Sequence, residues 1–119
     1  MKITICGSMN FAKDMLEVQK VLEGRGDICY MPARVKEHAS GEVKFANGYE
    51  HAQVKIQYDL IRKHYDLIKN SDAILVLNYK KNDVENYIGG NSFLEIGFAH
   101  ILEKKIFLLN PIPDNPSMR

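Results

Sequence analysis

The sequence predicts an α/β fold, a three-layer sandwich in which helices cover a small, mainly parallel sheet of four to five strands. Short apolar runs alternate with longer stretches of helical periodicity along the chain, and this alternation is typical of parallel sheets. The run Asp72–Asn78 is almost wholly apolar, as expected of a central strand that is buried on both faces. A length of 119 residues fits one domain over residues 1–119.

The first half of the chain predicts the strand Lys2–Cys6, the helix Phe11–Glu23 and the strand Asp27–Met31. Gly7 and Ser8 follow the first strand, at the end of a parallel sheet where ligands bind, although ordinary loop chemistry explains them equally well. There is no G-x-G-x-x-G motif, so a dinucleotide fingerprint is absent.

Residues Pro32–Glu50 show no sustained period, which is typical of a lid, a binding loop or a disordered stretch. Three basic side chains in or beside this stretch are candidate substrate contacts, with solvated loop residues as the default interpretation: Arg34, His38 and His51.

The second half predicts the helix His51–Asn70, the strand Asp72–Asn78, a polar connection Tyr79–Ile88, a further helix and the strand Lys105–Asn110. Asn78 closes its strand and is expected at the carboxyl edge of the sheet. No helix follows the last strand, so we expect a second copy of the chain to cover that face in a homodimer or a higher homo-oligomer.

Composition excludes several classes of function. The net charge of +1 offers no electrostatic attraction for a nucleic acid polymer or an anionic membrane, and no apolar run is long enough for a membrane span. Cys6 and Cys29 lie in expected strands, which predicts reduced core thiols in a cytoplasmic protein. The histidines lack metal-ligand spacing, so we expect no metal and no cofactor, with His100 as a core residue.

The stretch Gly89-Gly90-Asn91-Ser92 precedes a strongly apolar helical pattern and predicts a loop that enters a helix. Asn91 or Ser92 is suited to cap the first turn, the glycines permit positive φ, and the exposed N–H groups of such a turn attract an anion. Glu95 is expected within that turn. Its carboxylate either interacts favourably with the positive end of the helix dipole or, because apolar residues flank it, points into a pocket.

Three segments together resemble the nucleoside 2-deoxyribosyltransferase family, which includes 2′-deoxynucleoside 5′-phosphate N-hydrolases: Cys6-Gly7-Ser8, Asn70–Val76, and Gly89–Ser92 leading to Glu95-Ile96-Gly97-Phe98-Ala99. The resemblance implies a flavodoxin-like, Rossmann-like fold and cleavage of an N-glycosidic bond. It makes Glu95 the nucleophile that forms a covalent deoxyribosyl ester, as in a retaining glycosidase.

By the same resemblance, a small-molecule nucleoside or nucleotide is the partner, and each substrate contact follows from its position in the family pattern. Gly89, Gly90, Asn91 and Ser92 hold the sugar or a 5′-phosphate, Cys6, Gly7 and Ser8 line the other side, and Asn78 or Tyr79 orients the substrate.

The chain departs from the family where an aspartate commonly assists departure of the base. His64 stands there, with Asp66 close by, and a histidine can protonate a leaving base near neutral pH. Asn91 and Ser92 also replace an acidic residue near the nucleophile. The segment Gly89–Glu95 is more weakly similar to the P-G-G-x-G-T-x-x-E signature of phosphoribohydrolases, which break the same kind of bond.

Three interpretations remain open from the sequence. The first is an enzyme that transfers the glycosyl group to another base or to water, and no residue separates these two acceptors. The second is a nucleotide-binding or sensing module that has lost turnover, which the replacement at His64 motivates. The third is a flavodoxin-like flavin binder.

Overall fold

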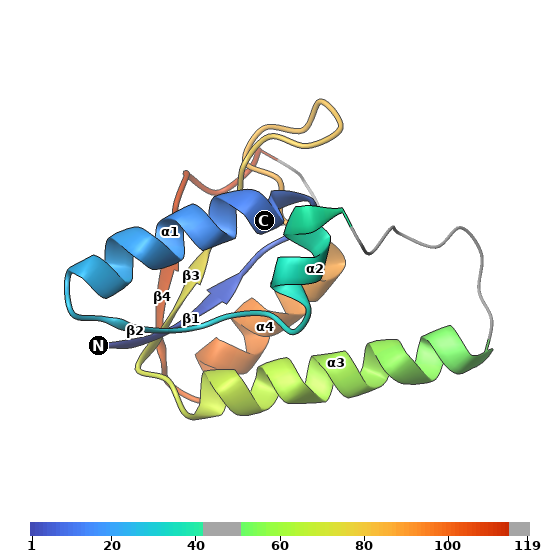
Figure 1. Cartoon of the computed structure of the whole chain (residues 1–119), viewed down its shortest axis with the longest axis horizontal. Coiled ribbons are helices and arrows are strands. Elements are labelled where there is room, and N and C mark those ends of the chain that lie inside the picture. The colour runs from blue at the N-terminus through green and yellow to red at the C-terminus, as the bar shows by residue number, and fades with distance from the viewer. Residues whose placement is uncertain (42–50, 115–119) are drawn as a thin grey trace.

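A computed structural model describes residues 1–41 and 51–114, and for residues 51–58 only the course of their helix. Four parallel strands form one sheet in the order β2-β1-β3-β4, which confirms the predicted α/β class (Figure 1). The strands are β1 (Lys2–Cys6), β2 (Ile28–Tyr30), β3 (Ala73–Val76) and β4 (Lys105–Leu108).

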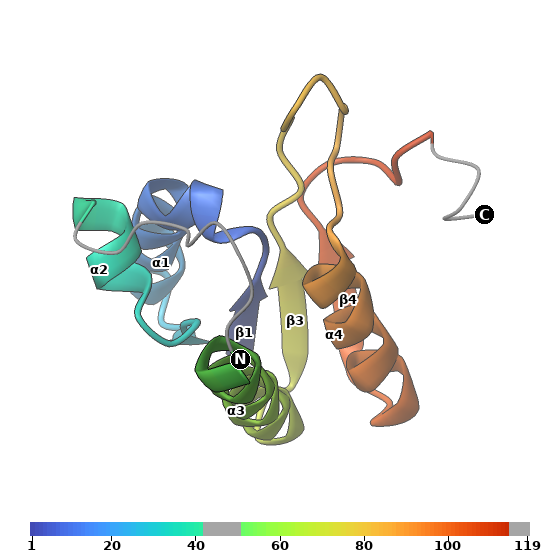
Figure 2. The same ribbon diagram turned by 90° about the vertical axis from the view of Figure 1, so that its right-hand side faces the viewer.

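Helices cover both faces of the sheet, as the three-layer prediction requires. On one face lie α1 (Ala12–Gly24), which the short 3-10 helix η1 (Met9–Phe11) precedes, and α2 (Val35–Ser40). On the other face α3 (His51–Lys69) and α4 (Gly90–Ile101) pack side by side (Figures 1 and 2). None of the described helices is long and apolar enough to cross a membrane.

Successive side chains of β1 point to opposite faces of the sheet, so the strand contributes to two cores, one beneath α1 and one beneath α3 and α4. Ile3 and Ile5 are buried with Met15 of α1, whereas Cys6 is buried with Ile68 of α3 and other residues of the α3–α4 face. This period of two is what a strand covered on both faces requires. It places the thiol of Cys6 beneath α3 and α4, at the carboxyl end of β1.

The register brings the ends of three strands to one edge. Cys6 pairs with Val76 and Val76 with Leu108, so the residues that follow these strands meet there. A hairpin formed by residues 79–88 projects beyond this edge (Figures 1 and 2). The carboxyl edge is therefore where loops gather, as the sequence predicted.

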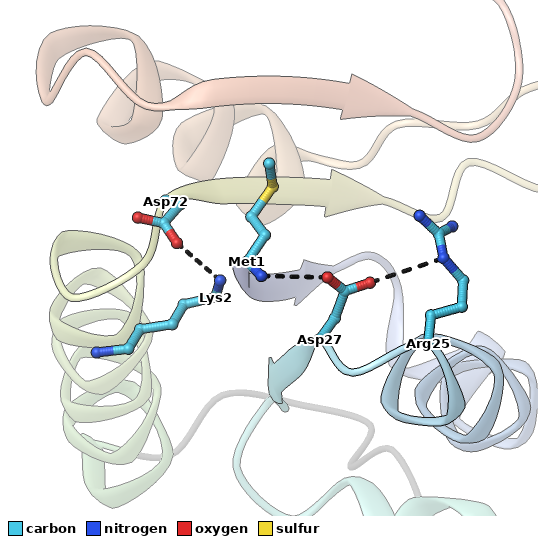
Figure 3. Close-up of polar contacts among 5 residues, drawn as sticks. All are labelled: Met1, Lys2, Arg25, Asp27 and Asp72. Atoms are coloured by element: carbon cyan, nitrogen blue, oxygen red, sulfur yellow. Dashed lines mark hydrogen bonds and ion pairs between the residues drawn. The ribbon is translucent and has the colours of Figure 1, made fainter.

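Contacts of the chain itself occupy the opposite, amino edge (Figure 3). The amino group of Met1 lies 3.2 Å from Oδ1 of Asp27, and Nε of Arg25 lies 4.0 Å from the other oxygen of that carboxylate. The backbone N–H of Lys2 donates to Oδ2 of Asp72 at 2.8 Å. These contacts hold the starts of β1, β2 and β3 together and use the acidic groups at that edge.

One expectation about the long irregular stretch needs revision. Helix α2 occupies residues 35–40 of the stretch that we expected to be irregular, and it packs on α1 with Val35 buried. Arg34 precedes it with a φ of 65°. Residues 42–50 and the side chain of His51 lie outside the described residues, so the predicted lid and the predicted contact at His51 stay predictions.

Candidate active site

Glu95 lies on the buried stripe of α4. Ser92, Glu95 and Ala99 follow one another at helical spacing, and Ser92 and Ala99 are both buried. Only 13% of the Glu95 side chain is exposed. The carboxylate therefore points inward, which supports the pocket interpretation over an acid that merely favours a helix terminus.

His64 on α3 meets that carboxylate. Its Nε2 atom lies 3.0 Å from Oε2 of Glu95, and only 8% of the His64 side chain is exposed. Ile68, one turn further along α3, is fully buried against the sheet. The packing of α3 against α4 thus places an imidazole and a carboxylate in direct contact in a site largely shielded from solvent.

Cys6 completes the cluster from the sheet. Its Sγ atom lies 3.5 Å from the same Nε2 atom of His64. A carboxylate only accepts hydrogen bonds, so we place the Nε2 proton toward Glu95, with the sulfur as a weak second partner. Burial, and then the nearby Glu95 charge, raise the pKa of the Cys6 thiol well above its ordinary value of 9.0. The thiol is therefore protonated at neutral pH and is a poor nucleophile.

The same three residues form a set of donors for a metal ion. The sulfur, the imidazole nitrogen and a carboxylate oxygen all lie within 4.8 Å of one another, and these are ligand types that Zn²⁺ takes. The spacing of the histidines along the sequence did not indicate this cluster, because its members come from β1, α3 and α4. A metal ion here would bind a carboxylate oxygen and draw electron density from it, so metal binding would weaken Glu95 as a nucleophile.

The turn after β1 is tightly constrained at Gly7. Its φ is +154°, and a Cβ atom would lie 3.2 Å from both the carbonyl oxygen of Leu77 and the side chain of Met15. Ser8 follows, and its Oγ atom accepts hydrogen bonds from the backbone N–H of Asn10 at 3.3 Å and from Nζ of Lys81 at 3.1 Å. Gly7 and Ser8 thus form a fixed loop close to Cys6.

Helix α4 begins earlier than we expected. Gly89 is its N-cap, without a side-chain cap, and Gly90, Asn91 and Ser92 already form the first turn. The expected cap at Asn91 or Ser92 is therefore wrong, neither glycine uses the positive φ that it permits, and Glu95 lies one turn deeper than the first. Gly90 and Asn91 are exposed, and the first N–H groups of a helix have no partner within it.

Asn78 is engaged with the C-terminal segment. Its Nδ2 donates to the carbonyl oxygens of Asn110 and Pro111 at 2.9 and 3.2 Å, and its Oδ1 accepts from the backbone N–H of Asn110 at 2.8 Å. The side chain is fully buried. Although it reaches the predicted edge of the sheet, its hydrogen-bonding groups are used by the chain and not left for a substrate.

The remaining candidates lie apart from the Cys6–His64–Glu95 cluster. Asp66 is exposed, because two residues after His64 a side chain points to another side of the helix. Tyr79 packs its ring edge-on against Phe11 at 5.1 Å, and burial, followed by the Asp14 charge, raises its pKa. Arg34 is exposed and His38 is half-buried on α2. His100 is exposed, so its expected place in the core is wrong.

Sequence reasoning missed Lys81 and Tyr87 in the connection between β3 and α4. Nζ of Lys81 lies 4.9 Å from the ring centroid of Tyr87, and a Cβ atom on Gly89 would lie only 3.0 Å from the Tyr87 hydroxyl. A tyrosine two residues before the Gly-Gly pair, in an otherwise polar segment, was the signal that marked this contact.

Solved structures of nucleoside-processing enzymes have a similar fold. A 2-deoxyribosyltransferase from Leishmania mexicana shares 20% identity over 90% of this chain, with a TM-score of 0.58, and the chain spans 62% of that enzyme. A 2-deoxyribosyltransferase from Bacillus psychrosaccharolyticus shares 18% identity over 94% of this chain and 77% of its own, with a TM-score of 0.63. A CMP N-glycosidase from Clostridium botulinum shares 17% identity over 91% of this chain and 70% of its own, with a TM-score of 0.52.

Neither a model of a known protein family nor a curated protein sequence matches the chain. At 17–20% identity the structural similarity establishes the fold. It agrees with the resemblance indicated by the sequence motifs, because all three enzymes carry names for chemistry at nucleosides or nucleotides.

Proposed function

We propose that this protein cleaves the N-glycosidic bond of a nucleoside or its 5′-monophosphate through a covalent glycosyl ester on Glu95. The observation that carries the proposal is the shielded contact between Glu95 and His64 at 3.0 Å. The fold, which is similar to those of two deoxyribosyltransferases and an N-glycosidase, supports it. The fold alone would not, because one fold supports many chemistries.

The reaction requires one free carboxylate oxygen. With Oε2 held by His64, the other oxygen of Glu95 attacks C1′ of the sugar as the bond from C1′ to the base nitrogen breaks. The base takes up a proton and leaves, and the sugar remains as an ester on Glu95. Water or a second base then attacks C1′, loses a proton and releases the carboxylate.

The geometry changes the role that we assign to His64. The sequence suggested that it protonates the leaving base, but its Nε2 atom contacts the proposed nucleophile, and a base leaves from the opposite face of C1′. We therefore assign His64 to positioning: its N–H fixes one oxygen of Glu95 and directs the other toward the substrate. Cys6 packs behind the imidazole as a protonated thiol.

We also propose a homodimer that uses the β4 side of the molecule. Strand β4 is an edge strand and α4 lies beside it (Figure 2). Large apolar side chains are exposed on β4, on α4 and on the segment that follows β4. They are Phe93, Leu94, Ile101, Ile106, Phe107, Leu109 and Ile112. A patch of this kind marks an interface.

Sedimentation should give a dimer. Phe107→Glu should dissociate this dimer, whereas Val21→Glu, at an exposed residue of α1 on another side of the molecule, should not.

The proposed activity is tested by incubating the protein with 2′-deoxynucleosides and their 5′-monophosphates, with and without a second free base. Chromatography should reveal released base. Release without formation of a new nucleoside or nucleotide identifies a hydrolase, and formation of one with the added base identifies a transferase. Binding without turnover of any compound would contradict the proposal and favour the sensing module. A flavin binder would be yellow when purified.

A further inference from the structure

The hairpin between β3 and α4 holds Lys81 in a defined position. Lys81 and Val84 exchange backbone hydrogen bonds of 3.0 and 2.9 Å, and the two residues between them, Asn82 and Asp83, both have positive φ, as a tight two-residue hairpin turn requires. The backbone N–H of Tyr87 donates to the carbonyl oxygen of Tyr79 at 2.9 Å, which closes the base of the hairpin.

From this position Lys81 bridges the two loops on either side of the carboxyl edge. Its Nζ atom donates to Oγ of Ser8, in the loop after β1, at 3.1 Å. The same atom lies 4.9 Å from the ring centroid of Tyr87, whose hydroxyl lies against Gly89, the N-cap of α4. A partly buried cation therefore stands between the two loops from which the sequence predicted substrate contacts.

The charge of Lys81 is not balanced by the chain, so far as the described residues extend. None of their carboxylates forms an ion pair with it, whereas the neighbouring Lys80 pairs with Glu85 at 3.4 Å and points to solvent. The first turn of α4 adds N–H groups and the positive end of a helix dipole beside it. The Ser8 hydroxyl already accepts two hydrogen bonds, so its own proton is left to donate. Lys81, the Ser8 hydroxyl and the first turn of α4 thus favour an anion with acceptor oxygens.

We propose that Lys81, with the Ser8 hydroxyl, binds the 5′-phosphate of the substrate, so that the substrate is a nucleoside 5′-monophosphate and not a free nucleoside. The inference rests on the proposed function. It fits the arrangement of the two sites, because Ser8 lies two residues from Cys6, which contacts His64 beside Glu95. One sugar then presents C1′ to Glu95 and its 5′-phosphate to Lys81.

The test measures binding separately from turnover. In a Glu95→Gln background, calorimetry compares each of the four common 2′-deoxynucleosides with its 5′-monophosphate. We expect the monophosphate of the preferred base to bind at least tenfold more tightly than its nucleoside. Lys81→Met should remove roughly ten- to a hundredfold of the monophosphate affinity, the range for a charge-assisted hydrogen bond, and should change nucleoside affinity less than about twofold. Lys81→Arg should restore most of the loss.

Lys80→Met is the matched control, because it removes a charge from the same hairpin at a residue paired outward with Glu85, and we expect it to change neither affinity. Equal affinity for nucleoside and monophosphate, or equal weakening of both by Lys81→Met in a variant with an unchanged melting temperature, would overturn the phosphate site. Parallel kinetics on the unmutated protein address the proposed function: tight, Lys81-dependent binding of a monophosphate without any release of base would leave the phosphate site standing and refute the enzyme.

Discussion

Two polar clusters lie at the carboxyl edge of the same sheet and differ in what their side chains contact. Asn78 uses its amide on the backbone of Asn110 and Pro111, and the side chain of Asn110 donates in return to the Asn78 carbonyl oxygen at 3.0 Å. Glu95, His64 and Cys6 instead contact one another through side chains alone. The first cluster holds the backbones of two chain segments together, whereas the second joins side chains of β1, α3 and α4.

The contacts that a polar cluster makes distinguish a structural cluster from a functional one more clearly than its place in the fold does. Hydrogen bonds from a buried amide to backbone satisfy polar groups that would otherwise be costly to bury. A buried carboxylate beside an imidazole and a thiol costs desolvation energy and gives little backbone support in return. Such clusters occur at functional sites because the chemistry needs them. Each prediction below changes one cluster and measures whether activity or stability responds.

The largest effect is expected at Glu95. Glu95→Gln keeps the size of the side chain and an acceptor for the His64 N–H, but removes the nucleophile, so release of base should fall by roughly four orders of magnitude or more. Single-turnover assays of base release measure this effect. The melting temperature should stay within a few degrees of the parent. Retained activity in a folded variant would exclude Glu95 as the nucleophile.

The next largest effect is expected at His64. His64→Gln places an uncharged N–H donor near the position of Nε2, whereas His64→Ala leaves Glu95 without a partner. If His64 positions Glu95, the alanine variant should lose roughly a hundredfold in kcat, on the scale seen when a supporting partner is removed, and the glutamine variant should recover most of it.

Rescue by glutamine distinguishes positioning from proton donation by His64. A positioning role leaves the glutamine variant active, because an uncharged amide N–H can take over the contact with Glu95 but cannot protonate a leaving base. Equal loss of kcat in both variants, with glutamine giving no rescue, would return His64 to the role of acid for the leaving base.

The fold was largely predictable because the spacing of apolar residues along the chain indicates which face of each helix or strand is buried. All four strands were predicted within a few residues of their observed bounds, and α3 ends at Lys69, one residue from the predicted end. Competition between local propensity and packing explains the error at the start of α4. Gly90, Asn91 and Ser92 have weak helix propensity, yet form the first turn of α4, because the apolar residues that follow hold the helix against the sheet.

The site was predictable only where a residue's own neighbours report its environment. Glu95 stands out because apolar residues flank it. The contact of His64 with Cys6 joins residues 58 positions apart, and no local pattern encodes it. Asn78 illustrates the reverse error: its place at the carboxyl edge was correctly predicted, but its partner, 32 residues further on, was not visible. Lys81 was missed for the same reason, because Ser8 lies 73 residues away.

Asn78 should control stability and not catalysis. Asn78→Ala removes two donated bonds and one accepted bond, and we expect the free energy of unfolding to fall by about 2–3 kcal/mol, at about 1 kcal/mol for each bond. Denaturant titration at fixed protein concentration measures this change. Activity per folded molecule should stay within about twofold of the parent, because this cluster does not touch the reaction. A large rise in KM without loss of stability would instead support the substrate contact that the sequence suggested.

The smallest effect is expected from Cys6 at alkaline pH. Burial, and then the Glu95 charge, raise the pKa of the folded thiol above 9.0, so the unfolded chain loses this proton first as pH rises. The contribution of the thiol is therefore complete below its ordinary, unfolded pKa of 9.0 and is lost above it, by at most about 1.4 kcal/mol per pH unit. Unfolding free energies between pH 8 and 10 should fall less steeply in Cys6→Ala than in the parent.

Cys29 is the matched control. Its pKa is also raised, but less strongly, so Cys29→Ala should flatten the slope less. Equal slopes in the parent and Cys6→Ala would mean that the thiol ionises in the folded protein, and Cys6 would then become a second candidate nucleophile beside Glu95.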